Sequence, residues 1–207
     1  TGLSTMLLLI IFLSLIWCLV WMENEERDPV WSHRAQTWLA LAIGLLLGLG
    51  MLTRYAFGWL LVPVLVYLVL VCALRRWQIF TLVVVTFALV VTPWLWRNYT
   101  VSGTPFGTAG YALVETTLTI PEYRLQRALD PDFRGVSLTT LRYKLVGNLR
   151  ALVQNELPRL GGSWVTALFA VGLLLSFRSL ALRRLRYFLL GALGVLILVQ
   201  ALGKTQL

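Results

Sequence analysis

The sequence predicts an all-α integral membrane protein, a polytopic bundle of about six transmembrane helices with an outer interfacial amphipathic helix. Of the 207 residues, 58% are hydrophobic and only 13% are charged, and the mean hydropathy is +0.78. The apolar residues are collected in long runs, and several tryptophans lie near the ends of these runs, as in the aromatic belts of membrane proteins: Trp21, Trp38, Trp77, Trp94 and Trp96. These observations exclude an ordinary soluble globular domain.

The charge of the chain is strongly basic, with 18 Lys and Arg residues against 9 acidic residues. Because the basic residues lie between apolar runs and form no continuous solvated face, we do not expect binding to nucleic acid. Cys18 and Cys72 fall inside apolar runs with no His, Asp or Glu at ligand spacing. The sequence therefore indicates packed or lipid-facing thiols, with no metal site and no cofactor signature.

The first three spans follow from the length of the apolar runs, because a bilayer core needs roughly 20 helical residues. Leu3 to Met22 is predicted to span the membrane. An acidic stretch, Glu23 to Asp28, follows it where a signal peptide would have a cleavage site. Two further apolar runs, 38–52 and 56–74, are separated by a polar triplet, so we expect two helices with a tight turn at Arg54.

Three more spans complete the prediction: Ile79 to Trp96, Trp164 to Phe177 and Tyr187 to Leu202. The chain is thus divided into helices 1–4 (residues 1–97), an outer segment (98–162) and helices 5–6 (163–207). The short-loop arginines at 75–76 and 178–186 would lie on one side, which the positive-inside rule makes cytoplasmic. The Arg54 turn and the outer segment are then expected on the outer face.

The outer segment contains signals for turns and for two helices. Glycines and a proline at 103–110 predict a turn-rich stretch. The sequence at 119–122 has the spacing of a capping box, so a short helix is expected to start there and to end before the turn at 130–132. Ser137 is the expected N-cap of a second helix, which the Pro and Gly residues at 158–162 would end.

The second outer helix is predicted to be amphipathic. Its apolar residues recur at three- and four-residue steps: Leu138, Leu141, Leu145, Leu149, Leu152, Val153 and Leu157. The polar positions are Arg142, Lys144, Asn148, Arg150, Gln154 and Asn155. Such a basic helix would lie flat at the outer interface. It could be inert and cover the mouth of the bundle, or it could bind a lipid-linked anionic substrate.

Two stretches carry a family resemblance: Gly44 to Tyr55, which ends in Leu-Thr-Arg-Tyr, and Thr92 to Tyr99, Thr-Pro-Trp-Leu-Trp-Arg-Asn-Tyr. With the interfacial helix that follows, they resemble membrane-embedded glycosyltransferases of the protein-mannosyltransferase and aminoarabinose-transferase type, which have the GT-C fold. The similar region runs from about Gly44 to Phe177. The resemblance implies transfer of a sugar from a polyprenyl-phosphate carrier to an outer-face acceptor by an inverting displacement.

In that family the catalytic carboxylate lies on a long outer loop after the first helix. This chain has no corresponding loop, because Thr1 leads directly into an apolar run, so we expect the loop upstream of this chain or lost. No motif assigns a catalytic role to any outer carboxylate, and the catalytic residues stay unknown: Glu115, Glu122, Asp130, Asp132 and Glu156.

Arg54, Arg97 and Lys144 are the candidate ligands of the carrier phosphate, since intramembrane and interfacial cations are candidates for functional sites. The alternative for each arginine is a side chain that snorkels to the interface. For the whole chain, the alternative is a non-catalytic membrane scaffold subunit of a larger complex; a lipid-linked substrate transporter is less favoured. The expected partners are membrane lipid, a polyprenyl-phosphate-linked sugar and other membrane subunits, in a bacterial cytoplasmic (inner) membrane.

Overall fold

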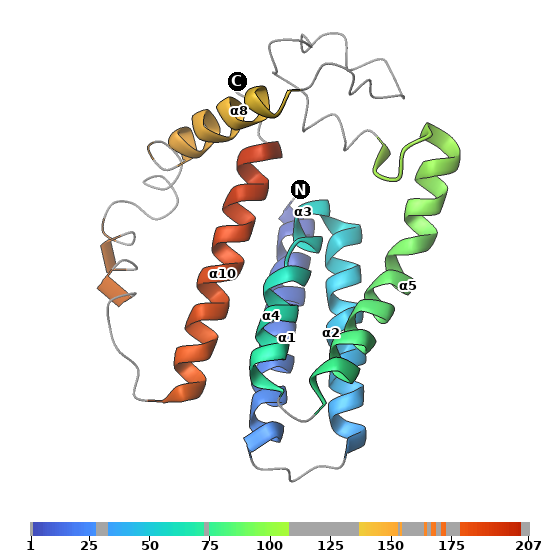
Figure 1. Cartoon of the computed structure of the whole chain (residues 1–207), viewed down its shortest axis with the longest axis vertical. Helices are drawn as coiled ribbons and strands as arrows, with labels where there is room; N and C mark the ends of the chain where they lie inside the picture. Colours follow the sequence, from blue (N-terminus) through green and yellow to red (C-terminus); the bar gives the residue numbers. More distant parts are fainter. Residues whose placement is uncertain are drawn as a thin grey trace. The chain divides into compact units, whose positions relative to one another are not determined.

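The computed structural model describes residues 2–27, 33–72, 75–107, 137–152, 154, 164, 167–168, 171–172 and 179–203. Every secondary-structure element in this part of the chain is a helix, which confirms the predicted all-α class (Figure 1). The chain divides into two compact units. The first contains residues 1–96 and 179–196, and the second contains residues 97–178 and 197–207.

Among the described residues, four helices are long and apolar enough to cross a membrane: α1 (Gly2–Arg27), α2 (His33–Thr53), α5 (Arg76–Ser102) and α10 (Leu180–Gly203). Many of their large apolar side chains are exposed, including Leu3 and Leu89. Exposing so much apolar surface on long helices is unfavourable in water and favourable in lipid. These helices therefore indicate an integral membrane protein.

The predicted break at Arg54 is present. Helix α2 ends at Thr53, Arg54 has an extended backbone (φ −147°, ψ 123°), and α3 (Tyr55–Gly58) begins at the next residue. The Arg54 N–H still donates to the Gly50 carbonyl at 2.9 Å, and the Arg54 carbonyl accepts from the Phe57 N–H at 2.9 Å. The turn is thus tight because Arg54 closes one helix and opens the next.

The predicted helix from 56 to 74 is wrong in its continuity and its length. The structure has α3, a turn at Trp59 and Leu60, and then α4 (Leu61–Val71). Pro63 lies in the first turn of α4, where its missing N–H is tolerated, but its ring would clash with the carbonyl four residues earlier in a continuous helix. The chain avoids this clash because the backbone hydrogen bonds before Pro63 join residues three positions apart. The Leu60 N–H donates to the Phe57 carbonyl, and the Val62 N–H donates to the Trp59 carbonyl.

Two helix ends extend beyond the predicted spans. Helix α1 continues through the acidic stretch to Arg27, and α10 begins at Leu180, so arginines 183, 184 and 186 lie on its first two turns. Both stretches are charged, and the sequence therefore predicts loops there. Arg and Glu are good helix formers, and a helix can project beyond the hydrocarbon without unsatisfied backbone groups. The predicted span 164–177 lies largely outside the described residues.

The core of the first unit lies among α1, α2, α3, α4 and the first parts of α5 and α10. The α1, α2 and α4 helices lie side by side (Figure 1), and their largest fully buried side chains include Leu15, Ile43, Leu47 and Leu68. Phe12 of α1 packs edge-on against Phe57 of α3, with ring centroids 6.5 Å apart. Cys72 is buried in this core and Cys18 packs against it. Apolar packing therefore joins helices that are distant in the sequence.

Helices α2 and α5 approach closely at two glycines. A Cβ atom at Gly44 would lie 2.7 Å from the Thr86 Cβ, and one at Gly48 would lie 2.7 Å from the Val90 Cβ. Only glycine allows this separation, since real Cβ atoms do not approach so closely. The glycine-rich stretch of α2 therefore permits a close approach of α5.

The second unit contains the end of α5, helix α8 (Leu138–Ala151) and the end of α10. After α5 the chain turns at Gly103 (φ 69°) and Gly107 (φ 54°), both in the left-handed region that favours glycine. Ser137 is the N-cap of α8, as predicted, and its hydroxyl accepts from the Thr139 N–H at 3.2 Å. The predicted helix near 119–129 and the predicted end at 158–162 lie outside the described residues.

Candidate functional site

The two stretches that carry the family resemblance meet in the first unit. The indole Nε1 of Trp94, on α5, donates to the hydroxyl oxygen of Tyr55, on α3, at 2.8 Å. Tyr55 directly follows Arg54, and the Trp94 side chain follows Pro93, which lies inside α5. The Leu-Thr-Arg-Tyr turn and the Pro-Trp segment therefore form one local structure, although 39 positions separate the bonded residues.

Arg54 projects from this structure as an exposed cation. It is exposed at the junction of α2 and α3, and its neighbour Thr53 ends α2 with its hydroxyl donating to the Leu49 carbonyl at 2.9 Å. The surroundings of Arg54 thus combine a positive charge, a tyrosine and a tryptophan at the end of an apolar helix. This combination suits an anionic group attached to an apolar chain.

Arg97 and Lys144, the other predicted phosphate ligands, belong to the second unit. Arg97 is exposed on α5, three residues after Trp94. Lys144 is on α8 and is buried, with a relative exposure of 9%. Arg54 and these two residues are therefore described in separate units, and their joint action on one phosphate stays a prediction.

The exposure of α8 differs from the simple amphipathic expectation. Its buried residues are Lys144 and Asn148, while Leu138, Tyr143 and Val146 are exposed. The Asn148 Nδ2 donates to the Ala201 carbonyl of α10 at 2.7 Å. That carbonyl lies two residues before Gly203, where the described part of α10 ends. The buried face of α8 therefore contains polar residues, one of which is hydrogen-bonded to α10.

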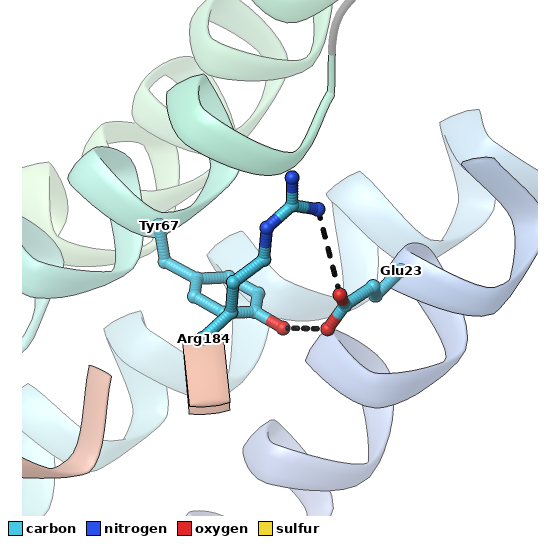
Figure 2. Close-up of polar contacts among 3 residues, drawn as sticks. All are labelled: Glu23, Tyr67 and Arg184. Atoms are coloured by element: carbon cyan, nitrogen blue, oxygen red, sulfur yellow. Dashed lines mark hydrogen bonds and ion pairs between the residues drawn. The ribbon is translucent and has the colours of Figure 1, made fainter. Parts of the chain in front are cut away.

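A second polar cluster, which the sequence analysis missed, lies in the first unit. Figure 2 shows Tyr67 of α4 and Arg184 of α10 both reaching the carboxylate of Glu23 on α1. The Tyr67 hydroxyl donates to Glu23 Oε2 at 2.7 Å, and Arg184 Nη1 lies 3.5 Å from Glu23 Oε1. The Glu23 side chain is 3% exposed and that of Arg184 is 35% exposed. Tyr67 also packs edge-on against Phe188, at 5.4 Å between ring centroids.

This cluster is best explained as a set of polar contacts that holds α1, α4 and α10 together. A buried carboxylate requires both hydrogen bonding and a nearby positive charge, and Tyr67 and Arg184 supply these. One sequence signal could have identified it: Tyr67 is the only hydroxyl-bearing residue of α4. A lone hydroxyl in an apolar helix needs a partner when it is buried.

Within the described part of the chain, no group of three or more His, Cys, Asp and Glu residues is placed to hold a metal ion. Comparisons with protein families, with curated proteins and with solved structures found no match for this chain.

Proposed function

We propose that this chain is the membrane-embedded part of a glycosyltransferase that moves a sugar from a polyprenyl-phosphate carrier to an acceptor on the outer face. The observation that carries the proposal is the hydrogen bond between Tyr55 and Trp94, because it brings together the two motifs on which the family resemblance rests. The close approach of α2 and α5 at Gly44 and Gly48 supports the same pairing.

The proposed role of Arg54 is to bind the carrier phosphate. When the sugar is transferred, the phosphate becomes the leaving group and gains negative charge. A guanidinium group at the membrane end stabilises that charge with directed hydrogen bonds where water is scarce. Arg97 is the second proposed ligand, since it is exposed and close to Trp94 along α5. Lys144 is the weakest of the three, because its side chain is buried.

The same proposal includes a bacterial cytoplasmic membrane, with the Arg54 end of the bundle outside. Its support is the distribution of charge in the first unit. Four arginines lie near the helix ends that are opposite the Arg54 end of the bundle. They are Arg34 at the start of α2, Arg75 after the end of α4, Arg76 at the start of α5 and Arg184 near the start of α10. An excess of arginine at short loops favours the cytoplasmic side.

The experiment compares Arg54→Gln with Arg54→Lys in nanodiscs that hold the full-length protein and a polyprenyl phosphate. Loss of a charge-assisted contact costs about 1.5 to 3 kcal/mol, so Arg54→Gln should weaken binding by roughly tenfold to a hundredfold. Arg54→Lys keeps the positive charge but loses the paired N–H donors of the guanidinium group. This variant should bind the polyprenyl phosphate with intermediate affinity. Arg183→Gln, an exposed arginine at the other end of the bundle, is the matched control.

Binding is expressed per folded molecule, and folding is followed by circular dichroism and size-exclusion chromatography. If Arg54→Gln binds the polyprenyl phosphate as well as Arg183→Gln does, the phosphate role is refuted. The scaffold subunit is then the better interpretation of this fold.

A further inference from the structure

A hollow of about 360 Å³ lies in the first unit where α2 and α5 begin. It is lined by Arg34, Thr37, Trp38, Leu41 and Arg75. Both helices start at the same end of the bundle (Figure 1). Arg34 is the first residue of the candidate span 34–53, and Arg75 directly precedes the candidate span 76–102. The hollow therefore lies at the boundary between the apolar spans and their polar ends.

Two of the five residues at the hollow are arginines, one at the start of α2 and one just before α5. Arg34 is exposed, and Arg75 is partly buried. The Arg75 Nε donates to the Gln78 Oε1 at 2.7 Å, which orients the guanidinium group. Arg34 is on α2 and Arg75 directly precedes α5. A phosphate group at the polar edge of the hollow would be favoured by both, because guanidinium groups donate hydrogen bonds to phosphate oxygens in pairs.

Nearly all of the surface that lines the hollow is apolar. Trp38 and Leu41 are three residues apart on α2 and therefore lie on the same face of the helix. Trp38 is 69% exposed, although it lies within a span. A free inorganic anion gains nothing from this wall. An amphiphile with a phosphate next to a hydrocarbon chain fits both parts.

We propose that this hollow binds an anionic glycerophospholipid of the leaflet in which α2 and α5 begin. The phosphate lies between Arg34 and Arg75, and an acyl chain runs along Trp38 and Leu41. The site is distinct from the proposed carrier site at Arg54, because α2 separates the two by a helix about 30 Å long. The inference does not depend on the proposed glycosyltransferase activity.

The test is lipid retention by the full chain released from nanodiscs and analysed by native mass spectrometry. The nanodiscs contain phosphatidylcholine, either alone or mixed with phosphatidylglycerol. The parent protein should retain phosphatidylglycerol in preference to phosphatidylcholine. Each basic residue near a membrane surface contributes about 1 kcal/mol of attraction to anionic lipid, so Arg34→Gln with Arg75→Gln should reduce the retained phosphatidylglycerol about tenfold or more.

The matched control removes the same charge outside the hollow, by Arg76→Gln with Arg183→Gln. Both residues are exposed. The control should retain phosphatidylglycerol as the parent does. Equal retention by the two double variants would refute the site, because net charge alone would then explain the preference. If Arg75→Gln impairs folding, Arg34→Gln alone provides the comparison, since its exposed side chain supports no core packing.

A third variant, Trp38→Ala, separates a lipid from a free phosphate. It should weaken retention of phosphatidylglycerol, because the apolar wall is reduced while both arginines remain. Soluble glycerol phosphate should compete poorly with the lipid for the parent protein. If glycerol phosphate displaces the lipid readily and Trp38→Ala has no effect, the hollow is an anion site only and the lipid proposal is wrong.

Discussion

Replacing Tyr67 with Phe tests whether the Glu23 cluster stabilises the bundle. The substitution keeps the ring that packs on Phe188 and removes only the hydroxyl that donates to Glu23 at 2.7 Å. A hydrogen bond to a charged group contributes about 1.5 to 3 kcal/mol, so the free energy of unfolding should fall by that amount. The effect should be near the upper end, because the carboxylate is buried.

A double-mutant cycle isolates the charge of Glu23. In the Glu23→Gln background the Tyr67 hydroxyl meets a neutral acceptor, and a neutral hydrogen bond contributes only about 0.5 to 1.5 kcal/mol. Tyr67→Phe should therefore cost about 1 kcal/mol less in that background than in the parent, and this difference is the coupling energy. Tyr187→Phe is the matched control, because Tyr187 is 59% exposed and its loss of a hydroxyl should change little.

The assay is reversible unfolding of the full chain in mixed micelles, followed by the circular dichroism of its helices. The reasoning is refuted if Tyr67→Phe costs the same in both backgrounds, or if it costs no more than Tyr187→Phe. Either result would mean that the carboxylate is satisfied without the tyrosine.

Three further predictions concern other contacts and the orientation. Gly48→Leu should destabilise the protein by about 1 to 3 kcal/mol in the same unfolding assay, because a side chain there meets Val90; Gly194→Leu, with open space around it, should not. Asn148→Ala should lower the free energy of unfolding by about 1 to 3 kcal/mol, because the Ala201 carbonyl of α10 loses its donor. Amide hydrogen exchange near Ala201 should then be faster than in the parent, and equal exchange rates would contradict this prediction. In a cysteine-free background, a membrane-impermeant maleimide added from outside should label a cysteine at position 107 but not one at position 183, and the reverse pattern would invert the orientation.

The features that the sequence predicted correctly depend on local chemistry. The polar triplet around Arg54 interrupts two apolar runs, and Ser137 precedes the first apolar turn of α8, so each signal is complete within a few residues.

The features that were missed depend on contacts between distant segments. Glu23 and Tyr67 are 44 positions apart, and Asn148 and Ala201 are 53 positions apart. Charge and polarity placed Glu23 in a loop and Asn148 on a solvated face, because a periodicity argument assumes that polar side chains face water. A polar residue that satisfies another helix reverses this assumption, and no local pattern records which helix will be its partner.

The position of Pro93 gives α5 a mechanical property. Proline has no N–H, so the Leu89 carbonyl loses its helical donor, and the helix bends most easily at this point. Trp94, the next residue, is the one that is hydrogen-bonded to Tyr55. The point at which α5 lacks one helical hydrogen bond is therefore next to the residue that connects α5 to α3.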